Sequence, residues 1–130
     1  MNDAVESGLT KMVSPVSSTP GLVLHQLGGH FPGSAVAHWA AGAAGRGVLL
    51  TGDTIFVNPD STASFMRSYP NRIPLSAPRV IRLADSVEPL GFDRIYNNFG
   101  ACIDADAKRL IRFSAERHAA WARGDYDDLT

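Results

Sequence analysis

The chain has a single cysteine, Cys102, among its 130 residues. One cysteine excludes an intramolecular disulfide and a zinc site built from cysteines alone. Its neighbours in the sequence are mostly apolar, so we interpret Cys102 as a small core residue rather than a catalytic thiol. No apolar run approaches the ~20 residues that cross a bilayer, and the N-terminus lacks the pattern of a signal peptide. We therefore expect a cytoplasmic protein.

An excess of one charge is also lacking, because 12 basic and 13 acidic residues leave a formal net charge of −1. This balance provides no electrostatic attraction for nucleic acid or for an anionic membrane surface. A hydrophobic fraction of 45% is ordinary for a globular protein, and a chain of this length forms one domain at most. We predict a flexible N-terminal arm over residues 1–20, a domain over 21–122 and a polar tail over 123–130.

Apolar runs and turn residues predict an α/β fold. Strands are expected at 22–27, 34–40, 48–51 and 92–97, with 55–57 continuing the same sheet. The second and third strands should form a hairpin across a glycine-rich turn at 42–47. Residues 58–76 are too apolar for a linker, and we expect a short helical turn near 64–67.

Two helices complete the predicted order. Ser76 is expected to cap the first, with Pro78 in its first turn and an end near Leu90–Gly91. Asp104 is expected to cap the last helix. Its apolar stripe is predicted to consist of Ala107, Leu110, Ile111, Ser114, His118 and Trp121. This order favours a mixed sheet with helices on one face.

Two polar clusters follow directly on apolar strands, and they contain His30 and Asp53. Open α/β sheets bind ligands at such strand ends. Gly28-Gly29 before the histidine and Pro32-Gly33 after it favour a tight, fixed loop, as a metal ligand requires. Taken singly, each residue also has an ordinary structural interpretation: a loop histidine bonded to backbone, and an aspartate in an Asx turn.

Together the clusters resemble the second half of the metallo-β-lactamase superfamily signature, a G-H-[ST]-P-G-S loop followed by a [ST]-G-D-[ST] loop. Here they read Gly29-His30-Phe31-Pro32-Gly33-Ser34 and Thr51-Gly52-Asp53-Thr54. The resemblance covers about residues 21–122 and implies half of an αββα sandwich. It also implies that His30 is the third histidine of a first metal site and that Asp53 is a carboxylate bridging two metals. The metal would be zinc or another divalent transition metal.

The sequence departs from this family in its ligands. The H-x-H-x-D-H cluster of the family's first half is absent, and Phe99 stands where the last histidine ligand is expected. Among the other histidines, His25 is ~16 Å from His30 along an extended chain. His38 is expected to bond within the sheet or to face the surface. His118 lies on an apolar helical stripe, which is typical of a hydrogen-bonded core or interface histidine.

Three hypotheses follow. The first is a truncated hydrolase relative whose degenerate metal site around His30 and Asp53 is completed by a second subunit. The second is a non-catalytic binding or structural module that retains the fold. The third is a fragment of a longer protein that holds the other ligands. Half a sandwich leaves one sheet face bare, so we expect a homodimer or a partner protein on that face. The substrate is not indicated.

Overall fold

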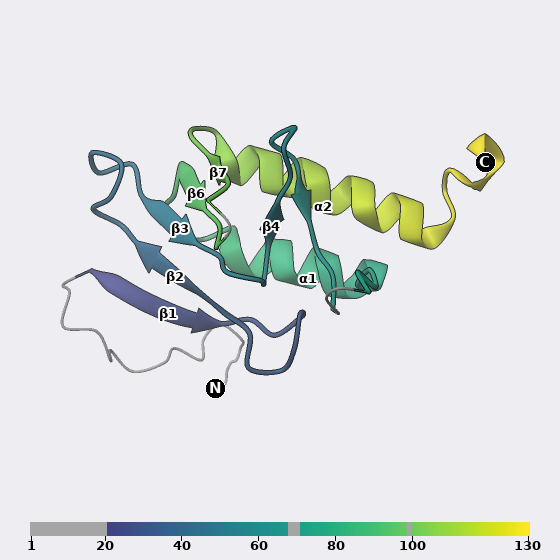
Figure 1. Cartoon of the computed structure of the whole chain (residues 1–130), viewed down its shortest axis with the longest axis horizontal. Coiled ribbons are helices and arrows are strands. Elements are labelled where there is room, and N and C mark those ends of the chain that lie inside the picture. The colour runs from purple at the N-terminus through teal and green to yellow at the C-terminus, as the bar shows by residue number, and fades with distance from the viewer. Residues whose placement is uncertain (1–20, 68–70, 99) are drawn as a thin grey trace.

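The computed structural model describes residues 21–67, 71–98 and 100–130, which form a two-layer α/β fold (Figure 1). The arm predicted at 1–20 and Phe99 lie outside the described residues. The elements are β1 (Leu22–Gln26), β2 (Ala35–Trp39), β3 (Val48–Leu50), β4 (Phe56–Val57), β5 (Ala63–Ser64), α1 (Ala77–Val87), β6 (Arg94–Tyr96), β7 (Cys102–Ile103), α2 (Ala107–Arg123) and the 3-10 helix η2 (Asp127–Leu129).

The main sheet has five strands in the order β1-β2-β3-β6-β7. β1, β2 and β3 are antiparallel neighbours, and β2 and β3 form the hairpin predicted across the glycine-rich turn. β6 runs parallel to β3, and β7 returns antiparallel to β6. The sheet is therefore mixed, as predicted. Because β3 and β6 are parallel, their carboxyl ends lie at the same edge of the sheet.

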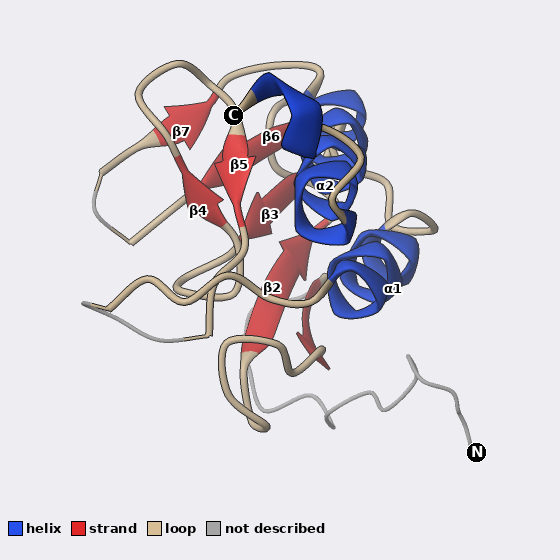
Figure 2. Cartoon of the chain, turned by 90° about the vertical axis from the view of Figure 1, so that its right-hand side faces the viewer, coloured by secondary structure: helices blue, strands red, loops and turns tan. Residues whose placement is uncertain are grey.

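A second, two-stranded sheet contains β4 and β5. The prediction that residues 55–57 continue the main sheet was wrong, because Phe56 pairs with Ser64 and Val57 with Ala63. The helical turn predicted near 64–67 was also wrong, since this segment is extended and Met66 forms an isolated bridge with Pro74. Pairing between nearby segments of the chain thus decides the conformation of its least regular part (Figure 2).

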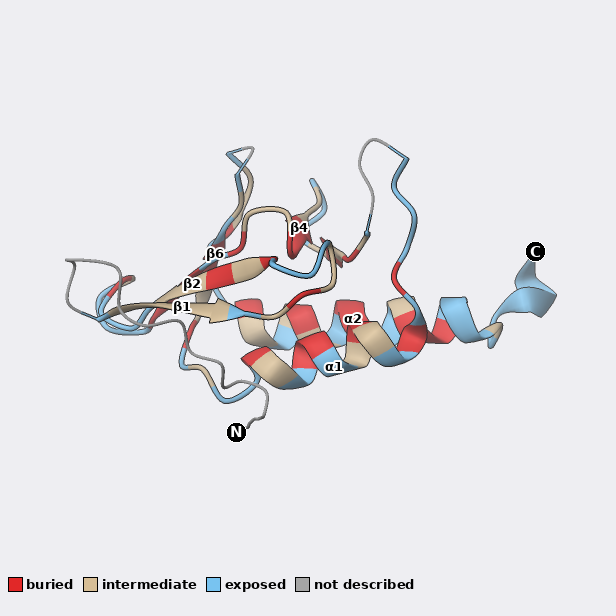
Figure 3. Cartoon of the chain, turned by 90° about the horizontal axis from the view of Figure 1, so that it is seen from below, coloured by how far each residue is buried: buried red, intermediate tan, exposed pale blue. Residues whose placement is uncertain are grey.

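Both helices cover the same face of the main sheet, as Figure 3 shows from below. Alternation along the strands directs one set of side chains toward the helices, and that set forms the core. The core cluster includes Val36, Leu49, Ile55, Phe65, Val80, Leu83, Ile95 and Ile111. The stripe predicted on α2 is only partly correct, because Trp121 is 42% exposed and Ala115 and Ala119 are buried instead.

No described helix is long and apolar enough to span a membrane.

The helix starts differ in how well the sequence predicted them. Ser76 is the N-cap residue of α1, although its side chain makes no capping hydrogen bond. The prediction that Asp104 caps α2 was wrong, because the N-cap residue is Asp106, in the left-handed conformation. Asp93, which precedes β6, supplies the cap: its carboxylate accepts the Asp106 N–H at 2.8 Å, and its carbonyl accepts the Ala107 N–H at 3.1 Å. A carboxylate at this end of a helix also opposes the helix dipole.

The sheet face opposite the helices is partly exposed and largely apolar, with Arg94 as a charged residue on it. Trp39, Leu50 and Tyr96 lie on it, with exposed fractions of 39%, 37% and 41%. The strand pairing places Ala37 beside Leu50, and Leu50 beside Tyr96, so these side chains are neighbours. Among the described residues no helix covers this face. A contiguous apolar surface of this kind is typical of an interface.

Candidate metal site

The two sequence clusters meet at one edge of the main sheet. The loop 28–34 joins β1 to β2, and the loop 51–54 follows β3. Because β2 and β3 are antiparallel, the start of β2 lies beside the end of β3. The loop after β6 reaches the same edge, because β6 is parallel to β3. Three loops far apart in the sequence therefore converge where the sequence predicted a ligand site.

A buried hydroxyl pair joins the first two loops. The Ser34 Oγ and Thr54 Oγ1 atoms lie 2.5 Å apart, and both residues are almost fully buried. Thr54 Oγ1 also donates to the carbonyl of Ala35 at 3.0 Å, so Ser34 donates to Thr54. Ser34 and Thr54 are the last residues of the two motifs. The motif residues thus hold the loops that carry His30 and Asp53 against each other.

Asn97, at the end of β6, holds the second loop from the other side. Its side-chain amide donates to the carbonyl oxygens of Gly52 at 2.6 Å and Ile55 at 3.0 Å. Thr51 Oγ1 also donates to the Ile55 carbonyl, at 2.8 Å. The backbone on both sides of Asp53 is therefore fixed by hydrogen bonds. The sequence analysis assigned no role to Asn97.

His30 is held in one orientation by the backbone of a distant segment. Its Nδ1 lies 2.7 Å from the carbonyl oxygen of Met66. Since a carbonyl can only accept, Nδ1 carries the proton, and the neutral ring presents a lone pair at Nε2. Phe31 and Phe56 contact the imidazole edge-on. A histidine that binds a metal usually has this arrangement, in which the second nitrogen donates to a carbonyl or carboxylate.

Asp53 faces the free nitrogen of His30. The Asp53 Oδ2 atom lies 3.8 Å from His30 Nε2, and the two side chains are 40% and 10% exposed. Asn98 donates to the other carboxylate oxygen, Oδ1, at 2.7 Å. Asn98 belongs to the loop in which Phe99 was expected to stand at a ligand position, and the sequence analysis assigned no role to Asn98.

The pair fits two ligands of a divalent transition metal. Zinc binds histidine nitrogen and carboxylate oxygen at about 2.0–2.2 Å, so two such ligands stand about 3.3–3.6 Å apart around one tetrahedral ion. The N–O distance of 3.8 Å is slightly longer than this and is also longer than a hydrogen bond. Within residues 21–67, 71–98 and 100–130, however, no three side chains of His, Cys, Asp or Glu are placed to hold one ion. The described part of the chain thus supplies two ligands, and a catalytic zinc site needs three.

The other histidines have separate surroundings. His118 Nε2 donates to the carbonyl of Leu75 at 2.8 Å, and its ring contacts Phe65, as expected of a satisfied histidine. His38 Nε2 donates to the carbonyl of Gly91 at 2.8 Å. The rings of His25 and His38 are 6.3 Å apart. Burial and the neighbouring His38 both lower the pKa of His25, and its buried Nδ1 has no hydrogen-bond partner among the described residues.

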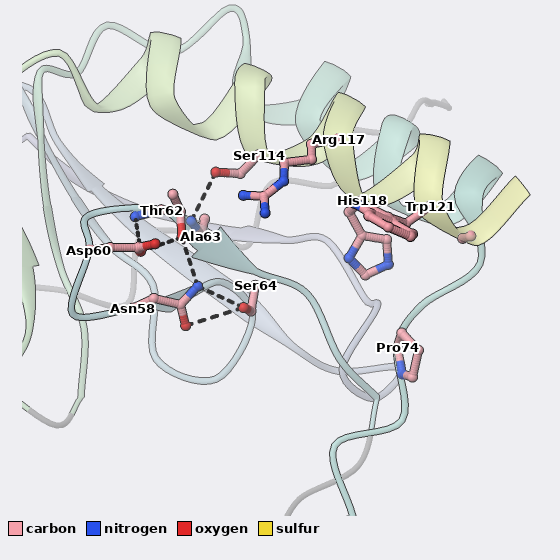
Figure 4. A pocket seen from close by; sticks show the side chains of 11 residues that line it. Asn58, Asp60, Thr62, Ala63, Ser64, Pro74, Ser114, Arg117, His118 and Trp121 are labelled. Atoms are coloured by element: carbon pink, nitrogen blue, oxygen red, sulfur yellow. Dashed lines mark hydrogen bonds between the residues drawn. The ribbon is translucent and has the colours of Figure 1, made fainter. Parts of the chain in front are cut away.

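A separate pocket of about 530 Å³ lies between the β4–β5 hairpin and α2 (Figure 4). Neither His30 nor Asp53 lines it. The polar groups of its hairpin wall bond to one another: Asn58 donates to Thr62 and Ser64, and Thr62 donates to Asp60. These bonds explain the wall as a structural element of the hairpin. We therefore place the candidate site at the sheet edge and not in this pocket.

Comparison with known proteins yields one informative relative. The chain is 50% identical over 100 residues to the uncharacterized protein YmaE of Bacillus subtilis (strain 168). The matched region covers 76% of this chain and 36% of YmaE. The chain thus spans about a third of the length of this curated relative. No protein-family model matches the chain, and no solved structure matches it.

Thr54→Val tests whether the buried hydroxyl pair holds the two loops together. The variant keeps the side-chain shape but removes the donor to Ala35 and the acceptor for Ser34. We expect the free energy of unfolding, measured by urea denaturation, to fall by about 1–3 kcal/mol. Thr54→Ser keeps the hydroxyl and should lose less. An equal or larger loss in the serine variant would contradict the assigned role.

His25 predicts a pH dependence of stability. Its pKa is lowered in the folded protein, so the unfolded chain binds more protons below the ordinary value of about 6.5. The free energy of unfolding should therefore be unaffected above this pH and fall as the pH drops below it, by up to about 1.4 kcal/mol per pH unit. His25→Gln should reduce this slope between pH 7 and 5. His38→Gln should reduce it less, because burial is the larger cause; an unchanged slope in both variants would refute the assignment.

Proposed function

We propose that this protein is a truncated relative of metallo-β-lactamase-fold hydrolases, and that His30 and Asp53 bind zinc or another divalent transition metal. The observation that carries the proposal is the position of His30 Nε2, 3.8 Å from Asp53 Oδ2, on two loops joined by buried hydroxyls. The mixed sheet with both helices on one face agrees with half of an αββα sandwich.

The surroundings of His30 and Asp53 support metal binding by the pair rather than a chance proximity of the two side chains. The Met66 carbonyl sets the tautomer of His30, and Asn98 fixes the carboxylate of Asp53 while leaving Oδ2 toward the imidazole. His30 is mostly shielded from water and Asp53 is open to it, so the site has a closed side and an accessible side. A divalent metal at such a site supplies Lewis acidity and makes water a nucleophile near neutral pH.

A second copy of the chain is proposed to complete the site and to cover the open sheet face. Trp39, Leu50 and Tyr96 on that face carry no charge, and the guanidinium of Arg94, which shares the face, donates to the Tyr96 hydroxyl and to the Asp104 carbonyl. The uncharged part of the face can therefore pack against a second copy. Identical apolar faces suit a two-fold interface, in which the same patch occurs on both subunits. The remaining metal ligands would then come from the partner subunit.

The competing function is a non-catalytic binding or structural module that keeps the fold. It is favoured by the lack of a third ligand among the described residues. In this case the hydroxyl pair and the Asn97 bonds serve only to stabilise the loops, and Asp53 is simply a hydrogen-bond acceptor for Asn98. Metal content separates the two functions.

We expect the purified protein to contain zinc when grown in zinc-replete medium, and His30→Ala and Asp53→Asn to lose it. The measurement is metal per chain by elemental analysis after gel filtration. His38→Gln is the matched control, because this histidine bonds a backbone carbonyl away from the site and should leave the metal content unchanged. Wild-type protein without stoichiometric metal would favour the non-catalytic module.

We also expect a dimer with twice the chain mass of 13.9 kDa by gel filtration with light scattering. Leu50→Asp places a charge on the open face and should shift the protein toward monomer. Phe113→Asp is the matched control, since this residue is 53% exposed on α2, on the helix side of the molecule. A dispersed wild-type monomer, or a dimer insensitive to Leu50→Asp, would refute the proposed interface.

A further inference from the structure

The pocket between the β4–β5 hairpin and α2 has walls that the protein itself holds in place (Figure 4). The backbone N–H of Ala63 donates to Ser114 Oγ at 2.9 Å, and both residues are buried, so this bond ties the hairpin to α2. Asn58 donates to Thr62 Oγ1 at 3.0 Å and to Ser64 Oγ at 2.8 Å. A pocket whose walls are fixed in advance loses little conformational entropy when it binds a ligand.

The wall that α2 contributes to this pocket combines aromatic rings with a cation. Arg117 and Trp121 are four residues apart and therefore neighbours on one face of the helix, and both line the pocket. The exposed Trp121 ring is braced by Tyr126, with ring centroids 4.9 Å apart. His118 lines the same wall, and its Nε2 is held by the carbonyl of Leu75 at 2.8 Å. An aromatic ring that is fixed and still exposed offers a surface on which a planar group can stack.

The guanidinium of Arg117 is directed into the pocket. Figure 4 shows this side chain extending from α2 toward the hairpin, beside Ser114 and Ala63. In the described part of the chain, Arg117 makes no hydrogen bond or ion pair, so its N–H donors are available to a ligand. A guanidinium binds a carboxylate through two parallel hydrogen bonds, which fix the orientation of the bound group.

Asp60, on the hairpin wall, limits the negative charge that a ligand can carry. Its Oδ1 accepts the backbone N–H of Thr62 at 3.1 Å and the Thr62 hydroxyl at 2.6 Å. These bonds, and after them the charge of Arg117, lower the pKa of Asp60, so its carboxylate is ionised at neutral pH. The pocket thus has a cation on one wall and an anion on the other. A dianionic group is repelled more strongly by Asp60 than a monoanion whose remaining part is uncharged.

We propose that this pocket binds a small aromatic carboxylate, with the carboxylate held by Arg117 and the ring stacked on Trp121. The volume of about 530 Å³ lies within the range of small-molecule sites, ~300–1,000 Å³. Pro74, from the segment before α1, provides a further apolar contact at the edge of the pocket. The binding site is separate from the proposed metal site, because neither His30 nor Asp53 lines the pocket.

The two tryptophans of the chain allow a direct test, because Trp121 lines the pocket whereas Trp39 lies on the open sheet face. Phenylacetate is titrated into the isotope-labelled full chain, and the two indole N–H resonances, assigned with Trp39→Phe, are followed by NMR. We expect the Trp121 resonance to shift and saturate while that of Trp39 stays in place. Arg117→Gln should weaken binding about tenfold or more. Arg109→Gln, which removes the same charge from an exposed position on α2 outside the pocket, should match wild type.

Phenylphosphate and phenethylamine test the charge of the recognised group. Both should bind more weakly than phenylacetate, because Asp60 repels the dianion and Arg117 repels the cation. Asp60→Asn keeps an oxygen acceptor for Thr62 and should reduce the difference between phenylphosphate and phenylacetate. The inference would be overturned by an unmoved Trp121 resonance, by equal losses in Arg117→Gln and Arg109→Gln, or by tighter binding of phenylphosphate or phenethylamine than of phenylacetate.

Discussion

The hydrogen bond between Ser34 and Thr54 is the contact on which the candidate site depends. Both hydroxyls are buried, and Thr54 also bonds the Ala35 carbonyl. A buried hydroxyl without a partner costs about 1–3 kcal/mol, so neither loop can move away from the other without this penalty. Asn97 adds the end of β6 to the same network through Gly52 and Ile55. The separation of His30 from Asp53 follows from these bonds, because each residue lies within a few positions of one of them.

The architecture leaves two features of the molecule incomplete in the described residues. The main sheet is covered by α1 and α2 on one face and exposes Trp39, Leu50 and Tyr96 on the other. The His30–Asp53 pair has no third ligand. A second sheet packed on the open face would bury the apolar side chains, and ligands from it would complete the pair.

Local patterns in the sequence were sufficient for β1, β2, β3, β6 and both α-helices, for the β2–β3 hairpin and for Ser76 at the start of α1. They did not predict β5 or β7. They also pointed to His30 and Asp53, since both follow apolar strands and come directly after a glycine, and the structure brings the two side chains to the same edge of the sheet. Alternation, glycine and capping residues act over a few positions, so a single sequence reveals them. The same patterns did not predict the pairing of β4 with β5, because it required a return of the chain through an irregular segment.

Only the tertiary structure decided which distant groups support the site. Met66 is 36 residues from His30, and Asn98 is 45 residues from Asp53. Asp93, not Asp104, caps α2, because the start of β6 reaches the helix from 13 residues away. Arg79 bonds Leu27 across 52 residues. The sequence does not indicate which distant carbonyl or amide group a side chain will bond, because the packing of the whole chain sets these partners.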